Sequence, residues 1–446
     1  MSTDRTVIIL SPHFPPSNLA GVHRARHLAK HLPAHGWRPI VLCVDEREHE
    51  QQLDADLAQL VPQDVAIEKV TAAPARLSRL AGVGDLGIRA FTQLRRRLMD
   101  IIARQHVDAV LITGSPFYPM LLAPLVRAKF GIPVVLDFQD PWVSAHGASH
   151  PVRSKADLAH RLSRRLEPRA LGGATFVTSV SEVQNDQMAG RYAWLDRERM
   201  AAIPIGCDPD DFSALRRLGD TSGRQHLAAG LINLSFVGTC MPRSGPLMIA
   251  FLEAVAHLRA THPAAMGQVR LNFIGTSNQP NAIDEFRILP LAKAAGLADA
   301  VHEVSQRVPY LEALGVLAHS DGLLLIGSDQ PHYTASKIYP ALMAQRPYLS
   351  LLHRSSSAHT ILSQTGGGIA VSFCSTAELE ACKANIGAAL LQLVTAPQTL
   401  PPANPAACSS FTARAIAGRF AAVFASIAQD VTDVLPAAPV PFHRSY

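Results

Sequence analysis

The chain has 446 residues, 48% of them hydrophobic and 17% charged, which is enough apolar content for two cores and excludes an intrinsically disordered chain. The net charge of +5 favours anionic partners in general and does not single out nucleic acid. No apolar run reaches the roughly 18 residues of a membrane span, no secretion signal begins the chain, and the six cysteines form none of the close pairs typical of zinc or redox sites, so a cytoplasmic protein is expected.

The first half of the chain alternates apolar runs of strand length with helical patterns. Strands are predicted at 6–11, 39–44, 107–112, 132–137 and 174–179. Helices are predicted at 88–104 and 119–130, and another is marked by a face of Val22, Ala25, Leu28, Ala29 and Leu32. Strands separated by helices form a parallel sheet with helices on both faces. The N-terminal domain is therefore expected to be Rossmann-like and to span residues 1–210.

The second half begins after a polar stretch at 211–230 that has the composition of a linker. Its predicted strands lie at 233–237, 269–274, 301–304, 322–326, 348–352 and 368–371. A second Rossmann-like domain is expected over 231–430, followed by a loose, proline-containing tail at 431–446. The expected fold class is α/β, with two doubly wound parallel-sheet domains that face a cleft.

Three short patterns lack the context that their usual chemistry requires. The GVGDLG stretch at 82–87 matches a dinucleotide fingerprint, but no strand precedes it. The stretch at 238–245 has Arg243 where a phosphate-binding P-loop has its lysine. One predicted helix carries a histidine at every fourth position: His23, His27, His31 and His35. No carboxylate partner for a metal is evident near them, so a histidine ladder that faces solvent or packs against a helix is favoured over a metal site.

Arginines gather in two predicted helices. One contains Arg89, Arg95, Arg96 and Arg97, and the other contains Arg161, Arg164, Arg165 and Arg169. Basic helix faces of this kind fit peripheral contact with an anionic membrane, and a solvated charged face is the alternative.

The loop after the first predicted strand contains Asn18 and places Gly21 just before a helix. Amide groups at the start of a helix can bind a phosphate, and an ordinary strand-to-helix connection is the alternative.

Seven segments stand out by their order and spacing: 15–21 (PPSNLAG), 135–142 (VLDFQDPW), 177–182 (VTSVSE), 203–212 (IPIGCDPDDF), 234–238 (LSFVG), 271–275 (LNFIG) and 336–347 (SKIYPALMAQRP). Together they resemble glycosyltransferase family 4, the retaining enzymes of GT-B architecture, and especially the branch that builds bacterial surface polysaccharides. The resemblance runs over most of the chain. It implies a nucleotide-sugar donor in the C-terminal domain and an acceptor on the N-terminal domain.

The resemblance also implies which residues act. The expected donor-binding residues are Asn18, Gly21, Gly238, Thr239, Arg243, Arg307, Val308, Thr334, Ser336 and Lys337. Thr334 or Ser336 is expected to cap a helix that carries Lys337, so that hydroxyl, amides and ammonium converge on the diphosphate. No metal or other cofactor is expected, because fixed positive charge can stabilise the leaving diphosphate.

Asp140 and His332 are the expected catalytic residues. Asp140 would orient or deprotonate the acceptor hydroxyl, or it would only cap the loop before Pro141. Members of the family usually carry two glutamates eight positions apart, where this chain has His332 and Pro340. The resemblance is weakest at this pair.

The first function expected is transfer of a hexose or N-acetylhexosamine from a nucleoside-diphosphate sugar, with UDP favoured, to a lipid-linked or glycan acceptor in cell-surface polysaccharide synthesis. The enzyme would then work in the cytoplasm, in peripheral contact with the inner face of the membrane. A catalytically degenerate GT-B protein that binds a glycan or protein partner is one alternative. A GT-B nucleotide-sugar epimerase is the other.

Overall fold

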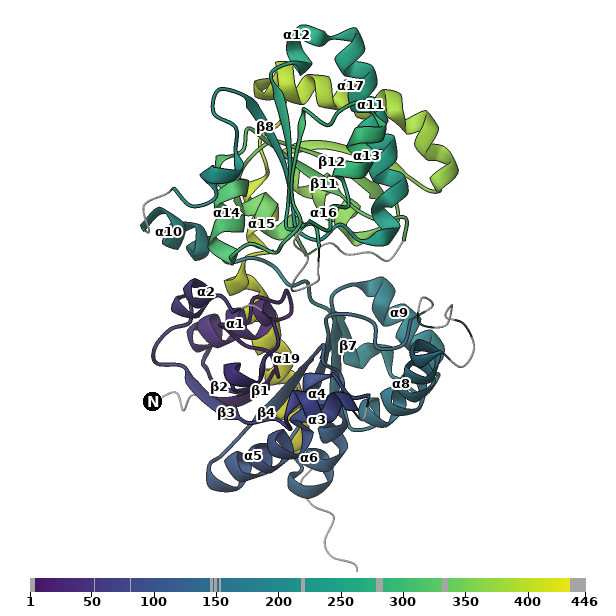
Figure 1. The fold of residues 1–446 in the computed structure, drawn as a ribbon. Helices are drawn as coiled ribbons and strands as arrows, with labels where there is room; N and C mark the ends of the chain where they lie inside the picture. The colour runs from purple at the N-terminus through teal and green to yellow at the C-terminus, as the bar shows by residue number, and fades with distance from the viewer. Residues whose placement is uncertain are drawn as a thin grey trace, which may run out of the picture.

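The computed structural model describes residues 5–51, 53–80, 82–144, 147, 151, 154–217, 221–277, 284–330 and 336–433. Two lobes, each built on one parallel sheet, lie one above the other (Figure 1). Two expected site residues, His332 and Thr334, and the expected tail from residue 434 lie outside the described residues.

The first sheet has seven strands in the order β3-β2-β1-β4-β5-β6-β7, and every pair is parallel. The strands are β1 (Arg5–Leu10), β2 (Trp37–Val44), β3 (Ala66–Val70), β4 (Ala109–Gly114), β5 (Val134–Phe138), β6 (Phe176–Ser179) and β7 (Met200–Ala202). The five predicted strands are confirmed to within two residues. The sequence did not reveal β3 and β7, because β3 is a largely exposed edge strand and β7 has three residues.

Helices cover both faces of this sheet. They are α1 (Val22–His31), α2 (Ala55–Gln59), α3 (Ala75–Leu80), α4 (Leu86–Arg89), α5 (Phe91–Arg104), α6 (Ala123–Phe130), α8 (Lys155–Leu171) and α9 (Glu182–Arg191). In β1, Val7 and Ile9 enter the core under α1, while Ile8 and Leu10 enter the core under α5 and α6. Burial on both faces explains why the strands are almost continuously apolar.

The second sheet has six strands in the order β10-β9-β8-β11-β12-β13, again all parallel. The strands are β8 (Ile232–Val237), β9 (Val269–Ile274), β10 (Val301–Val304), β11 (Gly322–Ile326), β12 (Tyr348–His353) and β13 (Gly368–Phe373). All six were predicted. Its helices are α10 (Pro209–Arg217), α11 (Gly245–Thr261), α12 (Pro263–Met266), α13 (Leu289–Ala294), α14 (Tyr310–His319), α15 (Ile338–Met343), α16 (Ser357–Thr365), α17 (Leu379–Thr395) and α18 (Pro405–Ser409).

The domain limits differ from the expected ones at two places. The polar stretch taken as a linker begins with α10, which packs against α14 of the second domain. The last helix, α19 (Ala413–Asp433), leaves the second domain and packs against α1 in the first. Its Phe420 and Phe424 are fully buried in the first-domain core. The yellow helix in the lower lobe of Figure 1 shows this return. The second domain therefore ends before residue 413, because the apolar face of α19 belongs to the first core.

One of the two arginine clusters is divided in the structure. Arg89 belongs to α4, is buried and pairs with Glu48 at 3.6 Å, so it is not part of a solvent-facing basic helix. Arg95 and Arg96 are exposed on α5. Within the described ranges, no helix combines the length and hydropathy needed to cross a bilayer.

Candidate active site

The carboxyl ends of the strands place the site between the two domains. Each sheet reverses its direction of growth beside its first strand, between β1 and β4 and between β8 and β11. In open parallel sheets, ligands bind at these positions. Residues that follow β1, β4 and β8 line two neighbouring cavities between the domains, of about 190 and 360 Å³. Both domains contribute side chains to both cavities.

Lys337 is the cation of the smaller cavity. Its Nζ lies 3.7 Å from the centroid of the Phe236 ring and 3.4 Å from the carbonyl oxygen of Thr239. In the part of the chain that the structure describes, no carboxylate forms an ion pair with it. Burial lowers the pKa of Lys337 to about 7. An anion entering this cavity would supply the counter-charge that the lysine lacks.

The turn after β8 brings the backbone to this lysine. Gly238 has a φ of 115°, a conformation that residues with a side chain rarely adopt. A Cβ atom at this position would lie 4.0 Å from Cδ of Lys337. That distance is an ordinary van der Waals contact, so it is the backbone conformation that favours glycine here.

The helix after Lys337 starts later than expected. α15 begins at Ile338, with Lys337 as its N-cap and no side-chain cap, so the prediction that Ser336 caps a helix containing Lys337 is wrong. Ser336 instead lines both cavities. Pro340 is the third residue of α15, where the absence of its N–H costs nothing. The late helix start therefore accommodates the proline that replaces a family glutamate.

Arg307 connects the two walls. Its Nη1 donates a hydrogen bond of 2.5 Å to the carbonyl oxygen of Asn18, across the boundary between the domains. Burial lowers the pKa of Arg307. Arg307 lines both cavities, and Val308 lines the smaller one.

The larger cavity is lined by Asp140 and by Gln139, one of whose side-chain atoms has no hydrogen-bond partner among the described residues. Asp140 follows β5 and is accessible from the cavity, whose protein walls raise its pKa by desolvation. Gln139 donates to Thr113 Oγ1 at 2.7 Å and to the carbonyl of Gly21 at 3.1 Å. Its Oε1 atom is buried and accepts no hydrogen bond from the described residues.

The structure brings most of the expected residues together. The smaller cavity is lined by Asn18, Gly238, Thr239, Arg307, Val308, Ser336 and Lys337. The larger one is lined by Gly21, Thr239, Arg307, Ser336 and Asp140. Arg243 lines neither: its guanidinium is held by Asp329 at 2.7 Å, on the exposed turn before α11. That pairing could not be expected from the sequence, because the two residues are 86 positions apart.

Residues 20–206 match the family model described as a glycosyl transferase 4-like domain. The first domain is thus similar to a glycosyl transferase 4-like domain. The curated protein sequences contain no match to this chain.

Solved structures similar to the whole chain share its fold at low identity. The chain is similar to HepE from Anabaena, in complex with UDP and glucose, at 15% identity and a TM-score of 0.57 over 96% of this chain and 99% of that one. It is also similar to WaaG, a glycosyltransferase involved in lipopolysaccharide biosynthesis, at 14% identity and a TM-score of 0.54 over 96% of this chain and 99% of that one. A third similar structure is a trehalose-6-phosphate protein from E. coli bound with UDP-2-fluoro glucose, at 13% identity and a TM-score of 0.58 over 97% of this chain and 100% of that one. These structures confirm the expected GT-B fold, and the expected resemblance to glycosyltransferase family 4 is confirmed for residues 20–206.

The first domain contains two fully buried arginines in α1 that sequence reasoning missed. Arg24 pairs with Asp137 at 3.2 Å and donates to the carbonyl oxygens of Ile203 and Pro204 at 2.6 and 2.8 Å. These bonds fix the end of the domain, where the chain leaves for the second lobe, to its first helix.

Arg26 forms a second buried pair that crosses between the domains. Its two terminal nitrogens donate to the two carboxylate oxygens of Asp211 at 2.8 and 2.6 Å. Tyr310 of α14 donates to the same carboxylate at 2.9 Å. Asp211 raises the pKa of Arg26 and so keeps the buried guanidinium charged. The network ties α1 of the first domain to α10 and α14 of the second.

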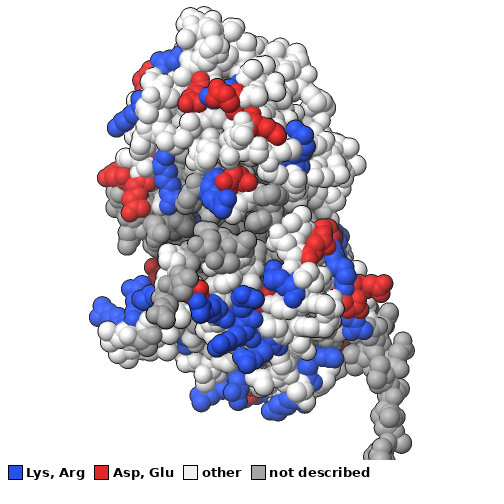
Figure 2. Space-filling model, turned by 90° about the vertical axis from the view of Figure 1, so that its right-hand side faces the viewer, with Lys and Arg blue, Asp and Glu red and all other residues white. Residues whose placement is uncertain are grey.

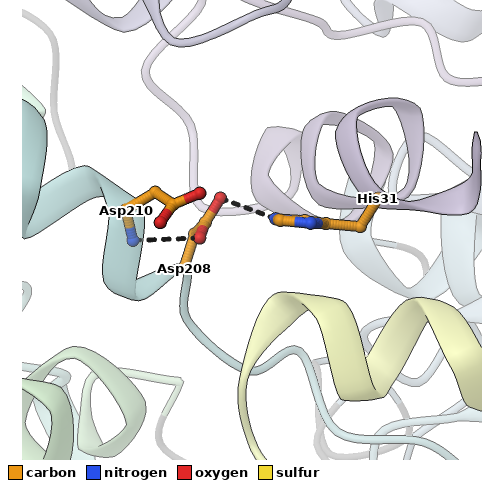
Figure 3. Close-up of side chains that lie close together, drawn as sticks. All are labelled: His31, Asp208 and Asp210. Carbon is orange, nitrogen blue, oxygen red and sulfur yellow. Dashed lines mark hydrogen bonds and ion pairs between the residues drawn. The ribbon is translucent and has the colours of Figure 1, made fainter. Parts of the chain in front are cut away.

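The histidines of α1 lie inside this domain boundary. His27 is buried and His23 lines the smaller cavity, so the packed ladder is confirmed for these two. His31 points at Asp208, 177 positions away, with Nε2 and Oδ2 at 2.8 Å (Figure 3). His31, Asp208 and Asp210 lie close enough together to hold a metal ion. Lys30 already supplies positive charge there, because its Nζ lies 2.8 Å from Asp208 and 3.0 Å from Asp210.

Proposed function

We propose that this protein transfers a hexose or N-acetylhexosamine from a nucleoside-diphosphate sugar, with UDP as the carrier, to a lipid-linked or glycan acceptor in cell-surface polysaccharide synthesis. The observation that carries the proposal is Lys337, a partly buried cation without a carboxylate partner among the described residues, at the base of a cleft between two Rossmann-like domains. UDP and UDP-glucose occupy HepE, and WaaG acts in lipopolysaccharide biosynthesis; both support the donor and the pathway by likeness of fold.

In the proposed reaction, the acceptor hydroxyl loses its proton and its oxygen forms a bond to the anomeric carbon of the donor. The bond from that carbon to the diphosphate oxygen breaks, and the electron pair leaves with the diphosphate. Lys337 stabilises the negative charge on the leaving group. Asp140, whose pKa is raised by desolvation, orients the acceptor hydroxyl or takes up its proton. We assign no metal to this reaction.

A second candidate function follows from the positions at which this chain has His332 and Pro340 in place of the two glutamates usual in the family. Pro340 lines the smaller cavity and offers no side-chain hydrogen bond to a ribose. A catalytically degenerate protein that binds nucleotide or glycan would show the same cavities. An assay for UDP released from UDP-glucose in the presence of membrane lipid extract distinguishes the transferase from the degenerate protein. The transferase cleaves UDP-glucose and releases UDP, whereas the degenerate protein binds the nucleotide-sugar and leaves it intact.

The donor assignment is tested by titrating the protein with UDP, GDP, ADP and CMP by calorimetry. We expect binding of UDP, and we expect Lys337→Ala to weaken it about tenfold to a hundredfold, since hydrogen bonds to charged groups are worth about 1.5–3 kcal/mol. Lys293→Ala is the matched control, because Lys293 is exposed on α13, outside the residues that line the cleft. Unchanged UDP binding by Lys337→Ala would remove the assignment.

We further propose that α8 brings the enzyme to an anionic membrane where a lipid-linked acceptor resides. Leu158 and Leu162 are 58% and 44% exposed on α8, beside exposed Arg161 and Arg165. Figure 2 shows that Lys and Arg gather on the lower, first-domain lobe. Exposed leucines flanked by arginines are the composition of helices that lie in a membrane surface.

Flotation with vesicles tests this surface. The protein is expected to float with vesicles that contain phosphatidylglycerol and not with neutral phosphatidylcholine, and Leu158→Ser with Leu162→Ser is expected to reduce flotation. Leu125→Ser is the control, since Leu125 is 41% exposed on α6. Equal flotation of both vesicle types would exclude an electrostatic attraction.

A further inference from the structure

A third cavity lies in the first domain beside the larger cleft cavity. Its volume is about 410 Å³, and its twelve lining residues are His13, Glu48, His49, Glu50, Gln51, Arg79, Gly84, Asp85, Leu86, Arg89, Ser115 and Pro116. It shares His13 and Ser115 with the larger cleft cavity, which contains Asp140. A molecule that places one end at Asp140 therefore has a neighbouring space for its remainder on the first-domain side.

His13 stands between the two cavities with an unused polar atom. Its side chain is 9% exposed, and Nδ1 is buried without a hydrogen bond to any described residue. Its ring packs edge-on to His49 at 5.1 Å between centroids. Burial and His49 lower the pKa of His13 to about 3, so the imidazole is neutral and holds one donor and one acceptor nitrogen. Buried polar atoms are almost always hydrogen-bonded, and a rotation of the ring that turns Nδ1 toward the cavity would let a ligand satisfy this one.

The same pattern continues into the larger cleft cavity. Gln139 Oε1 and the Tyr339 hydroxyl are buried without a hydrogen bond to the described residues, and both side chains line that cavity. Neutral polar atoms without a hydrogen bond to the described residues thus lie along the path from the cleft to the third cavity. Neutral donors and acceptors suit hydroxyl groups, which donate and accept equally.

The charges of the third cavity argue against an anionic ligand. Arg79 pairs with Glu50 at 3.0 Å, and Arg89 pairs with Glu48 at 3.6 Å while its Nε donates to a backbone carbonyl. Asp85 adds a third carboxylate to two guanidinium groups. A phosphate here would meet an excess of negative charge. A lipid chain would meet few apolar side chains, since Leu86 and Pro116 are the apolar members of the lining.

We propose that the third cavity is a second acceptor subsite, which binds the sugar next to the reacting one in a neutral glycan of at least two units. The inference rests on the proposed transferase function and narrows its acceptor: the reacting sugar lies at Asp140, and the adjoining sugar passes His13 into the cavity. The enzyme then elongates a saccharide chain and does not add the first sugar to a lipid phosphate.

Gly84 allows a test that leaves the reacting groups in place. A Cβ at Gly84 would meet no atom within 4 Å, and the exposed residue lines the third cavity, so Gly84→Phe adds a bulky side chain at its rim without a clash at Cβ. Gly190→Phe is the matched control, because Gly190 of α9 is exposed, also has open space at its Cβ and lines none of the three cavities.

The probes are methyl glycosides of neutral monosaccharides and disaccharides, with sugar phosphates as an anionic set, measured by saturation-transfer NMR with UDP present. At least one disaccharide is expected to bind about tenfold more tightly than its monosaccharide, as two or three additional hydrogen bonds would give. Gly84→Phe is expected to abolish that difference, and Gly190→Phe to keep it.

Three results would overturn the subsite: no saccharide binds, disaccharides gain nothing over monosaccharides, or Gly84→Phe leaves the gain intact. Tighter binding of sugar phosphates than of neutral disaccharides would also overturn it. A parallel UDP titration tests the donor site separately. Loss of UDP binding with retained disaccharide binding would contradict the proposed transferase and leave the subsite standing.

Discussion

The two walls of the cleft hold their charges in different ways. In the first-domain wall, Arg24 and Arg26 are fully buried, and each has a carboxylate partner that positions it. In the second-domain wall, Lys337 lies against the Phe236 ring without a carboxylate partner in the described chain. A buried cation with its partner in place is already compensated, so loss of that partner destabilises the fold, and a cation without a partner is ready for an anionic ligand. Buried charge therefore indicates a binding site only when its partner is absent.

Removing the partner of a first-wall arginine should have the largest effect. Asp211→Ala leaves Arg26 buried and uncompensated, and loss of one partner of a buried pair costs about 3–5 kcal/mol. We expect this loss in the free energy of unfolding, measured by urea denaturation. Asp210→Ala is the control, since Asp210 is 64% exposed in its pair with Lys30. Equal stability of the two variants would mean that Arg26 is not held by Asp211.

Asp140 should affect turnover and not donor binding. Asp140→Asn keeps the shape of the side chain and removes its ability to accept a proton, so we expect transfer to slow by about a hundredfold or more. UDP affinity should stay the same, because Asp140 lines the larger cavity and not the one that contains Lys337. Initial rates and calorimetry measure the two quantities. If the variant lost UDP affinity while its transfer rate stayed the same, Asp140 would belong to the donor site and not to the acceptor site.

The pH dependence of UDP binding should report on Lys337. A bound diphosphate favours the charged lysine and raises its pKa above the value of about 7 in the free protein. Binding therefore takes up a proton above pH 7, and affinity falls with rising pH by up to about tenfold per unit until the pKa of the complex is reached. Lys337 makes no such contribution to the pH dependence below pH 7.

Calorimetry in buffers of different ionisation enthalpy measures the proton uptake. Lys337→Arg is the control, because arginine stays charged over this range and should flatten the slope. The same slope in wild type and Lys337→Arg would assign the dependence to another group.

The contact across the cleft should have the smallest effect. Arg307→Met removes the hydrogen bond to the Asn18 carbonyl, and a contribution of about 1 kcal/mol corresponds to a loss of about fivefold in UDP affinity. Arg270→Met is the control, because Arg270 binds a backbone carbonyl on the outer part of the second domain. An unchanged affinity would show that the two walls act independently.

Strand patterns predicted eleven of the thirteen strands, because most strands of these buried parallel sheets are rich in apolar residues, whereas β3 is largely exposed and β7 has three residues. The cleft followed from the resemblance and from the order of the strands. The ion-pair partners of individual charged residues could not be predicted from the sequence, because Asp211 lies 185 positions from Arg26 and Asp208 lies 177 positions from His31. The sequence also showed Arg243 as a free cation, and only the structure shows Asp329 beside it.

The helix α19 gives the first domain an unusual dependence on the end of the chain. Its Ile416, Phe420 and Phe424 complete one face of the first core, yet more than 200 residues of the second domain are synthesised before them. At a synthesis rate of about 5–20 residues per second, that face stays open on the ribosome for on the order of ten to forty seconds. The nascent first domain thus exposes an apolar groove while the second domain folds, and a truncated message would yield a lobe prone to aggregation.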